Sequence, residues 1–453
     1  MKGRRVSGRD TVASETIRDR PLNVDDCMLL SVDRALRRLG FPGFETQTLI
    51  WLARRVSVPD LRKALASLVQ EFPTMTSRLL EPPQAARPCW RLRPGRDCTF
   101  TQTELISSNT ECVLSHASRL LSTLCDPTEN DPIRFHLLSR PNGKDVFVVH
   151  FNHALMDHNQ VLGVLRSIDR YFGTDTAPPP PATSTDLVRG YLRRFSRQRK
   201  RAAIRVANQW RRLLRGGSVT LGKELGQNSG EKVLALAVRQ LNAEQTAALE
   251  KSLHRIGGMP SLSMAMLGSA FRVIQRLVGN SANGKHFCTG IGVELGVNRA
   301  KGVGLQNLTS MVPVKISPEY LADPDEVTRI LAGEIRNRLA TEMDLGIVAG
   351  SALLNRWPWQ ANWFVEILLR YAVSLWYGYF GSMDSVGERF CGAAVEQIFS
   401  VGPAWAPAGL TLLVNKFHGC LHFQATYLPA SVPEPLLQQF LDGLLDELIQ
   451  RSA

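Results

Sequence analysis

The sequence lacks any pair of cysteines spaced Cys-x-x-Cys, although it contains eight cysteines. They are scattered along the chain as Cys27, Cys89, Cys98, Cys112, Cys125, Cys288, Cys391 and Cys420. Closely spaced cysteines are the usual signature of a zinc cluster or a redox dithiol, so their absence argues against both kinds of site. The N-terminal charges are not followed by a secretory apolar region. We therefore expect free thiols in a reducing cytoplasm and no metal site.

The sequence also lacks an uninterrupted apolar run of about 20 residues, the length that a membrane-spanning helix needs. The segment 357–380 is rich in tryptophan and tyrosine and is apolar except for Glu366, Arg370 and small polar residues. The two charges are four residues apart, so they can pair on one face of a helix. Two interpretations stay open for this segment: a buried helix or active-site cover, and a helix that lies at a membrane surface.

Acidic residues are absent from the segment 189–215, which holds most of the formal net charge of +13. Its cationic residues are Arg189, Arg193, Arg194, Arg197, Arg199, Lys200, Arg201, Arg205, Arg211, Arg212 and Arg215. Apolar residues recur among them every three or four positions, which predicts one basic amphipathic helix. Such a helix can pack between two lobes, or it can attract an anionic membrane or the phosphates of coenzyme A or a carrier arm. Binding to nucleic acid is disfavoured because no nucleic-acid module accompanies the charge.

The length of 453 residues exceeds the usual limit for a single hydrophobic core, so we expect two lobes. The four prolines at 178–181 form a stiff linker just before the basic segment. We therefore expect a flexible basic tail at 1–20, a first lobe at 21–177, a linker and basic helix at 178–216, and a second lobe at 217–453.

A histidine and an aspartate stand at the end of a predicted buried strand. The apolar run Val146–Phe151 is typical of such a strand, and the residues from Val161 onward follow helical spacing. His153 and Asp157 therefore lie in the turn between strand and helix, where rigid elements hold a side chain at the rim of a sheet. An imidazole placed there can act as a general base near neutral pH. Asp157 can also serve as the cap of the following helix.

The pattern His-x-x-x-Asp in this context resembles the signature of an acyltransferase superfamily. That superfamily contains chloramphenicol acetyltransferase, plant alcohol acyltransferases, wax-ester synthases and peptide-synthetase condensation domains. Three further stretches are similar to it, in the same order along the chain: a helix over Pro59–Phe72 followed by Pro73, the segment Val303–Val314, and the loop Ser400-Val401-Gly402-Pro403. The sequence departs from condensation domains by having Asn152 before the histidine and His158 after the aspartate.

The resemblance implies an α/β fold of two chloramphenicol-acetyltransferase-like lobes with an active-site tunnel between them. It implies that His153 is the base and that Asp157 orients the loop through an arginine, for which Arg299 is the candidate. Asn152, Ser400 and Gly402 are candidates for substrate binding. The acyl donor would be an acyl-CoA or an acyl group on a phosphopantetheinyl carrier protein, as a co-substrate instead of a bound cofactor. The acceptor would be a hydroxyl or an amine.

Two alternatives stay open for the function. The chain could be a peptide-synthetase-type condensation enzyme that forms amides, or a non-catalytic relative that keeps the fold as a docking module. The aromatic and basic features favour a lipid-like substrate and a peripheral association with anionic membranes. For the second lobe we predict strands over His286–Leu295 and Thr309–Ile316 and a hairpin around His418-Gly419. We also predict a final helix with a capping box formed by Ser431 and Glu434.

Overall fold

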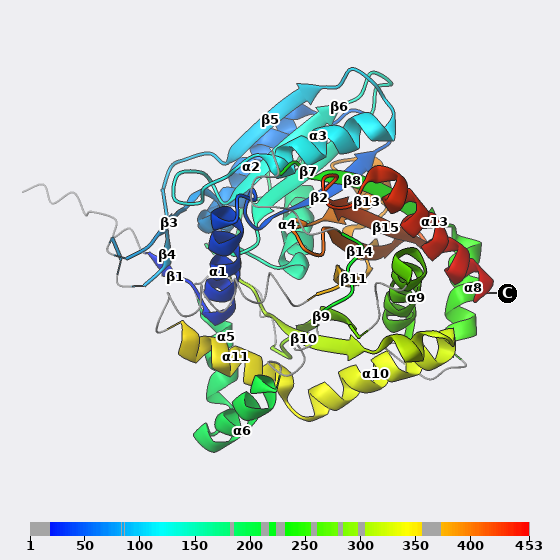
Figure 1. Ribbon diagram of the computed structural model, residues 1–453. Coiled ribbons are helices and arrows are strands. Elements are labelled where there is room, and N and C mark those ends of the chain that lie inside the picture. The colour runs from blue at the N-terminus through cyan, green and yellow to red at the C-terminus, as the bar shows by residue number, and fades with distance from the viewer. Residues whose placement is uncertain are drawn as a thin grey trace, which may run out of the picture.

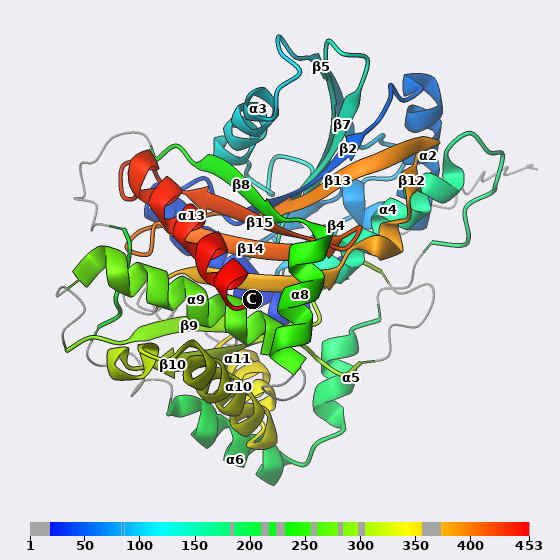
Figure 2. The ribbon, with the colours of Figure 1, turned by 90° about the vertical axis from the view of Figure 1, so that its right-hand side faces the viewer.

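The computed structural model describes residues 19–82, 84–85, 87–181, 185–209, 217–222, 232–254, 261–279, 284–297, 304–355 and 373–452 of the chain. Helices and strands mix in both halves of the chain, which confirms the predicted α/β class. The two main sheets have six and four strands. Figure 1 and Figure 2 show the larger sheet above the smaller one, each covered by its own helices.

The six-stranded sheet forms the first lobe and carries the candidate site. Its strands are, in spatial order, β12 (Arg389–Phe390), β13 (Ala393–Val401), β2 (Glu45–Leu52), β7 (Asp145–Asn152), β6 (Ile133–Ser139) and β5 (Thr99–Glu104). The helices of this lobe are α1 (Val24–Arg38), α2 (Val58–Glu71), α3 (Thr110–Ser122) and α4 (His158–Tyr171). Every residue of β7 is buried, because α2 and α4 pack on one face of the sheet and α3 packs on the other.

The second half of the chain contributes β12 and β13 to the sheet of the first lobe. β13 pairs antiparallel with β2, so that Ser400 lies opposite Thr48. A clean division into lobes at 21–177 and 217–453 is therefore wrong for residues 389–401, which belong to the first lobe's sheet. The physical reason is that β13 completes the ladder of β2, whose backbone groups on that side would otherwise be buried without partners.

The four-stranded sheet forms the core of the second lobe. Its strands are, in order, β11 (Trp376–Ser382), β14 (Leu410–Phe417), β15 (Cys420–Tyr427) and β8 (Ala235–Leu241). Its covering helices are α8 (Ala243–His254), α9 (Ser261–Val278), α10 (Pro324–Ala340) and α13 (Glu434–Gln450). The predicted hairpin is confirmed, because β14 and β15 pair around a turn at His418 and Gly419. The segment 376–380, which we expected to be helical, is instead the start of β11, while residues 357–372 lie outside the described ones.

Smaller elements lie below and beside these sheets. The predicted strands are confirmed as β9 (Phe287–Glu294) and β10 (Thr309–Ile316), which form an antiparallel pair. A small sheet contains β1 (Arg20–Pro21), β4 (Cys89–Arg91) and β3 (Arg78–Leu80). Single 3₁₀ turns cover Pro73–Thr76, Pro318–Leu321 and Asp384–Val386. The final helix begins at Glu434 after Pro433 with no side-chain cap, so the capping box predicted from Ser431 is wrong.

The basic segment does not form one helix, contrary to the prediction from its apolar spacing. It forms α5 (Leu187–Arg193) and α6 (Arg197–Asn208), and residues 210–216 lie outside the described ones. The break has a local cause, because the Ser196 hydroxyl accepts a hydrogen bond from the Arg199 N–H at 3.1 Å and caps a new helix. α6 packs closely on α11 (Met343–Leu354), and Gly346 has no room for a side chain beside the Ala203 carbonyl.

Candidate active site

His153 lies in the turn between β7 and α4, as the sequence predicts. The backbone N–H of His153 donates to the Phe44 carbonyl at 2.9 Å. The Asn152 side chain braces the same turn: its oxygen accepts from the Ala154 N–H at 3.0 Å. Its Nδ2 donates to Asp33 Oδ1 at 3.0 Å and to Glu45 Oε1 at 2.9 Å. These contacts hold the Asn152 side chain inside the first lobe, where it supports the turn. Its predicted role in substrate binding stays a prediction.

The His153 ring is partly buried against aromatic side chains. Its centroid lies 4.8 Å from that of Phe44 and 6.4 Å from that of Phe151. Burial lowers the pKa of His153 below its ordinary value, and nearby backbone groups and the charge of Asp157 offset only part of this effect. The imidazole is therefore neutral at physiological pH. A neutral imidazole is the form that can accept a proton.

Asp157 connects the turn to the second half of the chain. Its Oδ1 accepts a hydrogen bond from the Gln160 N–H at 3.1 Å, which caps α4. Its Oδ2 accepts a hydrogen bond from the Leu308 N–H at 3.0 Å. Asp157 is almost fully buried, so both bonds are shielded from water. The predicted partner Arg299 lies outside the described residues. Asp157 thus fixes the β7–α4 turn to the segment before β10 through the backbone N–H of Leu308.

Asn307 is a second connection between the turn and the segment that precedes β10. Its Nδ2 donates to the His153 carbonyl at 2.9 Å and to Asp26 Oδ1 at 2.8 Å. Its backbone N–H also donates to Asp26 Oδ1, at 2.9 Å. Burial raises the pKa of Asp26 to about 6, although Arg20 at 3.7 Å and the bonds from Asn307 favour the charged form. Asp26 was not predicted as a site residue; its only sequence signal is the capping box that it forms with Asn23 at the start of α1.

Ser400 and Gly402 lie at the crossover of the two sheets. The Ser400 and Thr48 hydroxyls are 3.3 Å apart, and both residues are buried. A side chain at Gly402 would make ordinary contacts with Thr46 and Leu413, so this position leaves space between β2 and β14. The structure records hydrogen bonding of the Ser400 side chain to Thr48 and none to His153. The two residues therefore belong to the lobe boundary near the site, and their predicted role in substrate binding stays a prediction.

The second lobe reaches the His153 turn with aromatic rings on two sides. The Trp405 ring lies 4.6 Å from that of Trp376, tilted by 44°, and 6.0 Å from that of Phe44, the ring that contacts His153. On the other side Phe380 stacks on His158 at 4.0 Å, and burial lowers the pKa of His158 to about 4. His158, which departs from the condensation-domain pattern, is thus a neutral packing residue. The His153 turn lies where both lobes meet.

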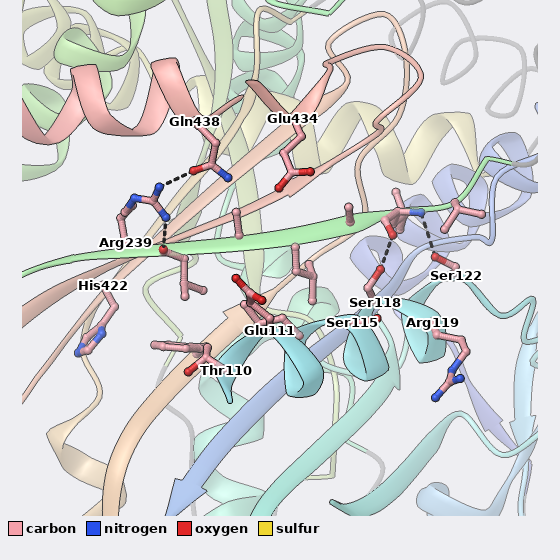
Figure 3. Close-up of a pocket in the computed structure, with 18 of the residues that line it drawn as sticks. Thr110, Glu111, Ser115, Ser118, Arg119, Ser122, Arg239, His422, Glu434 and Gln438 are labelled. Atoms are coloured by element: carbon pink, nitrogen blue, oxygen red, sulfur yellow. Dashed lines mark hydrogen bonds between the residues drawn. The ribbon is translucent and has the colours of Figure 1, made fainter. Parts of the chain in front are cut away.

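A large cavity of about 1420 Å³ lies between α3 of the first lobe and β8 of the second. Figure 3 shows side chains of both lobes around it, with His422 at one end and Ser122 near the other. Phe399 of β13 also lines the cavity, and its ring lies 5.5 Å from that of His422. The cavity therefore opens along the boundary between the lobes.

No family model matches the sequence, and no curated protein is similar to it in sequence. Comparison with solved structures finds clear similarity in shape. The first condensation domain of the CDA synthetase aligns with a TM-score of 0.70 and 13% identity, over 96% of each chain. The condensation domain of the monacolin K polyketide synthase MokA aligns with a TM-score of 0.66 and 14% identity, over 96% of this chain and 97% of that one.

The chain has the condensation-domain fold. The trichothecene 15-O-acetyltransferase TRI3 of Fusarium sporotrichioides is also similar, with a TM-score of 0.69 and 12% identity over 95% of this chain and 94% of that one. These identities show the fold alone, and they agree with the two-lobed architecture that the sequence resemblance implies. Among the described residues, no cluster of His, Cys, Asp and Glu side chains could hold a metal ion. None of the described helices is long and apolar enough to cross a membrane.

The lowered pKa of His153 predicts how activity depends on pH. If His153 is a general base, only its neutral imidazole accepts the proton, so kcat/KM should rise with pH through the pKa of His153 and then level off. Because burial lowers this pKa, the midpoint should lie below 6.5, the ordinary value for histidine. Rates measured from pH 5 to 8 test this prediction, with thermal unfolding at each pH as the control for titration of Asp26. A midpoint above 6.5 in a stably folded protein would contradict it.

Proposed function

We propose that the protein is an acyltransferase that moves an acyl group from a thioester to a hydroxyl or amine acceptor. The observation that carries the proposal is the position of a neutral His153 at the meeting of two lobes, on a loop fixed by Asp157 and Asn307. The fold is shared with condensation domains and with an acetyltransferase, which supports the same class of chemistry. The donor would be an acyl-CoA or an acyl group on a carrier protein.

The proposed reaction is a direct transfer without an acyl-enzyme. His153 accepts the proton of the acceptor while the acceptor oxygen or nitrogen attacks the thioester carbonyl carbon. A tetrahedral oxyanion forms, which hydrogen-bond donors must stabilise. The oxyanion then collapses, the carbon–sulfur bond breaks, and the leaving thiolate takes the proton from His153. The reaction moves one acyl group and one proton, so it balances without a redox step. The thioester is a co-substrate.

Mass spectrometry would test this proposal directly. The full-length protein is mixed with a panel of acyl-CoA and acyl-carrier donors, together with mixed alcohols and amines. A product mass equal to acceptor plus acyl group supports the proposal, and its chemistry distinguishes an ester from an amide. Binding of donors without any product over the whole panel would favour the alternative of a non-catalytic docking module. The departures at Asn152 and His158 do not favour that module, because Asn152 braces the His153 turn and the His158 ring packs on Phe380.

We also propose that the enzyme associates with anionic membranes through α6. Arg197, Arg201 and Arg205 are exposed and lie four residues apart, so they form a stripe on one face of the helix. Like charges at this spacing repel each other, and α6 contains no acidic residue to offset them. A cavity of about 430 Å³ beside the stripe is lined by Leu192, Ile204 and Leu353, of which Leu353 is 43% exposed. Cations next to apolar surface suit a lipid headgroup and its chain.

The protein is expected to sediment with anionic vesicles at low ionic strength and to be released in part by salt. Salt screens the charges, whereas it does not weaken insertion of apolar side chains. Replacing Arg197, Arg201 and Arg205 with glutamine should lower the bound fraction at every salt concentration, since each charge near the surface contributes about 1 kcal/mol.

A matched control keeps the net charge of that variant but leaves α6 intact. Arg166, Arg329 and Arg336 are exposed arginines on other helices, and replacing these three with glutamine should leave vesicle binding nearly unchanged. Equal loss of vesicle binding in the two triple variants would show that binding depends on the net charge of the protein and not on the position of the arginines on α6. No binding of the wild-type protein to anionic vesicles at low salt would reject the proposed membrane association.

A further inference from the structure

Strand β8 is an edge strand with one long side open to the large cavity. Among the described strands it pairs with β15 alone, with Ala235 opposite Tyr427 and Leu241 opposite Leu421. Every residue from Val233 to Gln240 lines the cavity of about 1420 Å³ (Figure 3). An edge strand presents backbone N–H and C=O groups that can pair with another extended chain. The cavity is therefore bordered by a strand with unused pairing capacity.

The contacts of Leu234 show which backbone groups face the cavity. The Leu234 N–H donates to Ser122 Oγ at 3.0 Å, and its carbonyl accepts from Ser118 Oγ. Both serines lie on α3, on the side of β8 opposite to β15. Orientation alternates along a strand, so the backbone groups of Leu236 and Val238 point the same way. Two serines of α3 thus take the place of a neighbouring strand at the beginning of β8.

After Leu234, the outward backbone groups of Leu236 and Val238 have no serine hydroxyls beside them among the described contacts. The Val238 carbonyl accepts one bond, from Arg239 Nη1 at 3.1 Å. Within the described ranges, no side chain or backbone group outside the sheet bonds to the outward N–H of Leu236 or Val238. Backbone N–H groups next to a cavity need a partner from water or a ligand. The stretch from Leu236 to Gln240 is therefore free to accept a strand.

Buried and charged side chains of the cavity describe the ligand further. His422 is only 4% exposed, lines the cavity, and has no hydrogen-bond partner for its Nδ1. Glu111 of α3 and Glu434 of α13 also line it, and neither forms an ion pair with a described residue. The nearby cation Arg239 is already paired with Asp442 at 2.9 Å. Arg119 also lines the cavity, but it contacts His116 on α3 and points away from Glu111 and Glu434 (Figure 3). The unpaired charge around Glu111 and Glu434 is thus negative, although the whole chain carries a net charge of +13.

We propose that β8 binds an extended peptide segment as a fifth strand of the second-lobe sheet, with a basic side chain of the peptide near Glu111 and Glu434. The eight residues that line the cavity span about 26 Å in a strand, which suits a peptide of several residues. A phosphopantetheine arm also carries amides, but its phosphate would be repelled by the two carboxylates. The inference goes beyond the proposed acyl transfer, because strand addition needs no turnover.

Hydrogen exchange with a defined peptide tests strand addition on the unmodified protein. The probe is acetyl-Val-Lys-Val-Thr-Val-amide, and its control is the same peptide N-methylated at alternate residues. The first peptide should slow exchange at Leu236 and Val238 by at least about tenfold, whereas the control, which cannot donate along one edge, should not. Full binding of the probe with no protection of these two amides would overturn the proposal. So would protection by pantetheine with none by the peptide.

A proline substitution gives a second, independent test. Leu236→Pro removes the outward N–H, which β15 does not use, and proline is tolerated on the open side of edge strands. It should weaken peptide binding about 2- to 13-fold, the equivalent of one hydrogen bond. Leu236→Ala retains the N–H and serves as the matched control. Equal affinity of the two folded variants would contradict strand addition. If the proline variant does not fold, the exchange experiment on wild-type protein decides.

The charge preference can be measured with the same probe. Replacing its lysine with norleucine keeps the length of the side chain and removes the cation. Wild-type protein should prefer the lysine peptide, and the double variant Glu111→Gln, Glu434→Gln should lose that preference at low ionic strength. If the double variant still prefers the lysine peptide to the norleucine peptide, Glu111 and Glu434 do not bind a basic side chain of the ligand. Because binding is measured without turnover, failure of these tests is distinct from failure of the proposed acyl transfer.

Discussion

Replacing His153 with alanine is expected to lower turnover by about 10² to 10⁴-fold, which is the contribution of a general base. His153 lies in a turn whose backbone is held by Phe44 and by Asn307, and the loss of the imidazole leaves both of these contacts in place. The variant should therefore fold and still bind the acyl donor. Steady-state kinetics on a verified substrate, with calorimetric donor binding as a separate measurement, would give both quantities.

A matched control for this variant is His116→Ala. His116 lies on α3 and contacts Arg119 there, so its removal takes away a histidine from another element than the β7–α4 turn. Its kcat should stay near the wild-type value. A His153→Ala variant that turns over at the wild-type rate would show that His153 is not the base. Loss of donor binding together with turnover would instead assign His153 to substrate binding.

Replacing Asp157 with asparagine is expected to lower both the free energy of unfolding and kcat. The two carboxylate oxygens accept from two backbone N–H groups, those of Gln160 and Leu308. An amide has only one oxygen, so in either orientation its NH₂ group must face one of these N–H groups. A buried donor without an acceptor costs about 1–3 kcal/mol. Denaturant unfolding and kcat, measured on the same preparation, test the two effects.

Asp186→Asn is the matched control for Asp157→Asn. Asp186 caps α5 by accepting a hydrogen bond from the Arg189 N–H at 2.8 Å. Unlike Asp157, it has no described hydrogen bond to the backbone of Leu308. Asparagine caps helices about as well as aspartate, so this control should change stability by only a few tenths of a kcal/mol. If both variants lose the same stability, capping and not the bond to Leu308 accounts for the role of Asp157.

Local pattern sufficed to predict the His153 turn. The change from an apolar run to helical spacing marks the end of β7 and the start of α4, and the turn between them needs no distant information. The role of Asn307 could not be predicted in this way. It donates to the His153 carbonyl across 154 positions of sequence, and neither residue type signals such a pairing. Asn307 lies in a stretch that the sequence resemblance identified, but its partner depends on how the lobes pack.

Where the prediction of the fold was wrong, the observed structure depends on a single residue or on pairing with a strand distant in sequence. Apolar spacing runs on through Ser196, yet the hydroxyl of Ser196 begins a new helix, so one predicted helix became two. The membership of β13 in the first-lobe sheet depends on which strand edge is open, and alternation within β13 does not contain that information. Likewise, aromatic composition favoured a helix through residue 380, whereas pairing with β14 makes 376–382 a strand.

The pairing of β13 with β2 also determines the order in which the protein can fold during synthesis. The side chains of Thr48 and Ser400 contact each other, although they are 352 residues apart in the sequence. The ribosome must therefore synthesise most of the second lobe before β13 can complete the first-lobe sheet. Until then β2 presents an open edge, and contacts so distant in sequence are slow to form. Truncated chains that end before β13 should therefore depend on chaperones, and the first lobe should not be obtainable as a separate stable fragment.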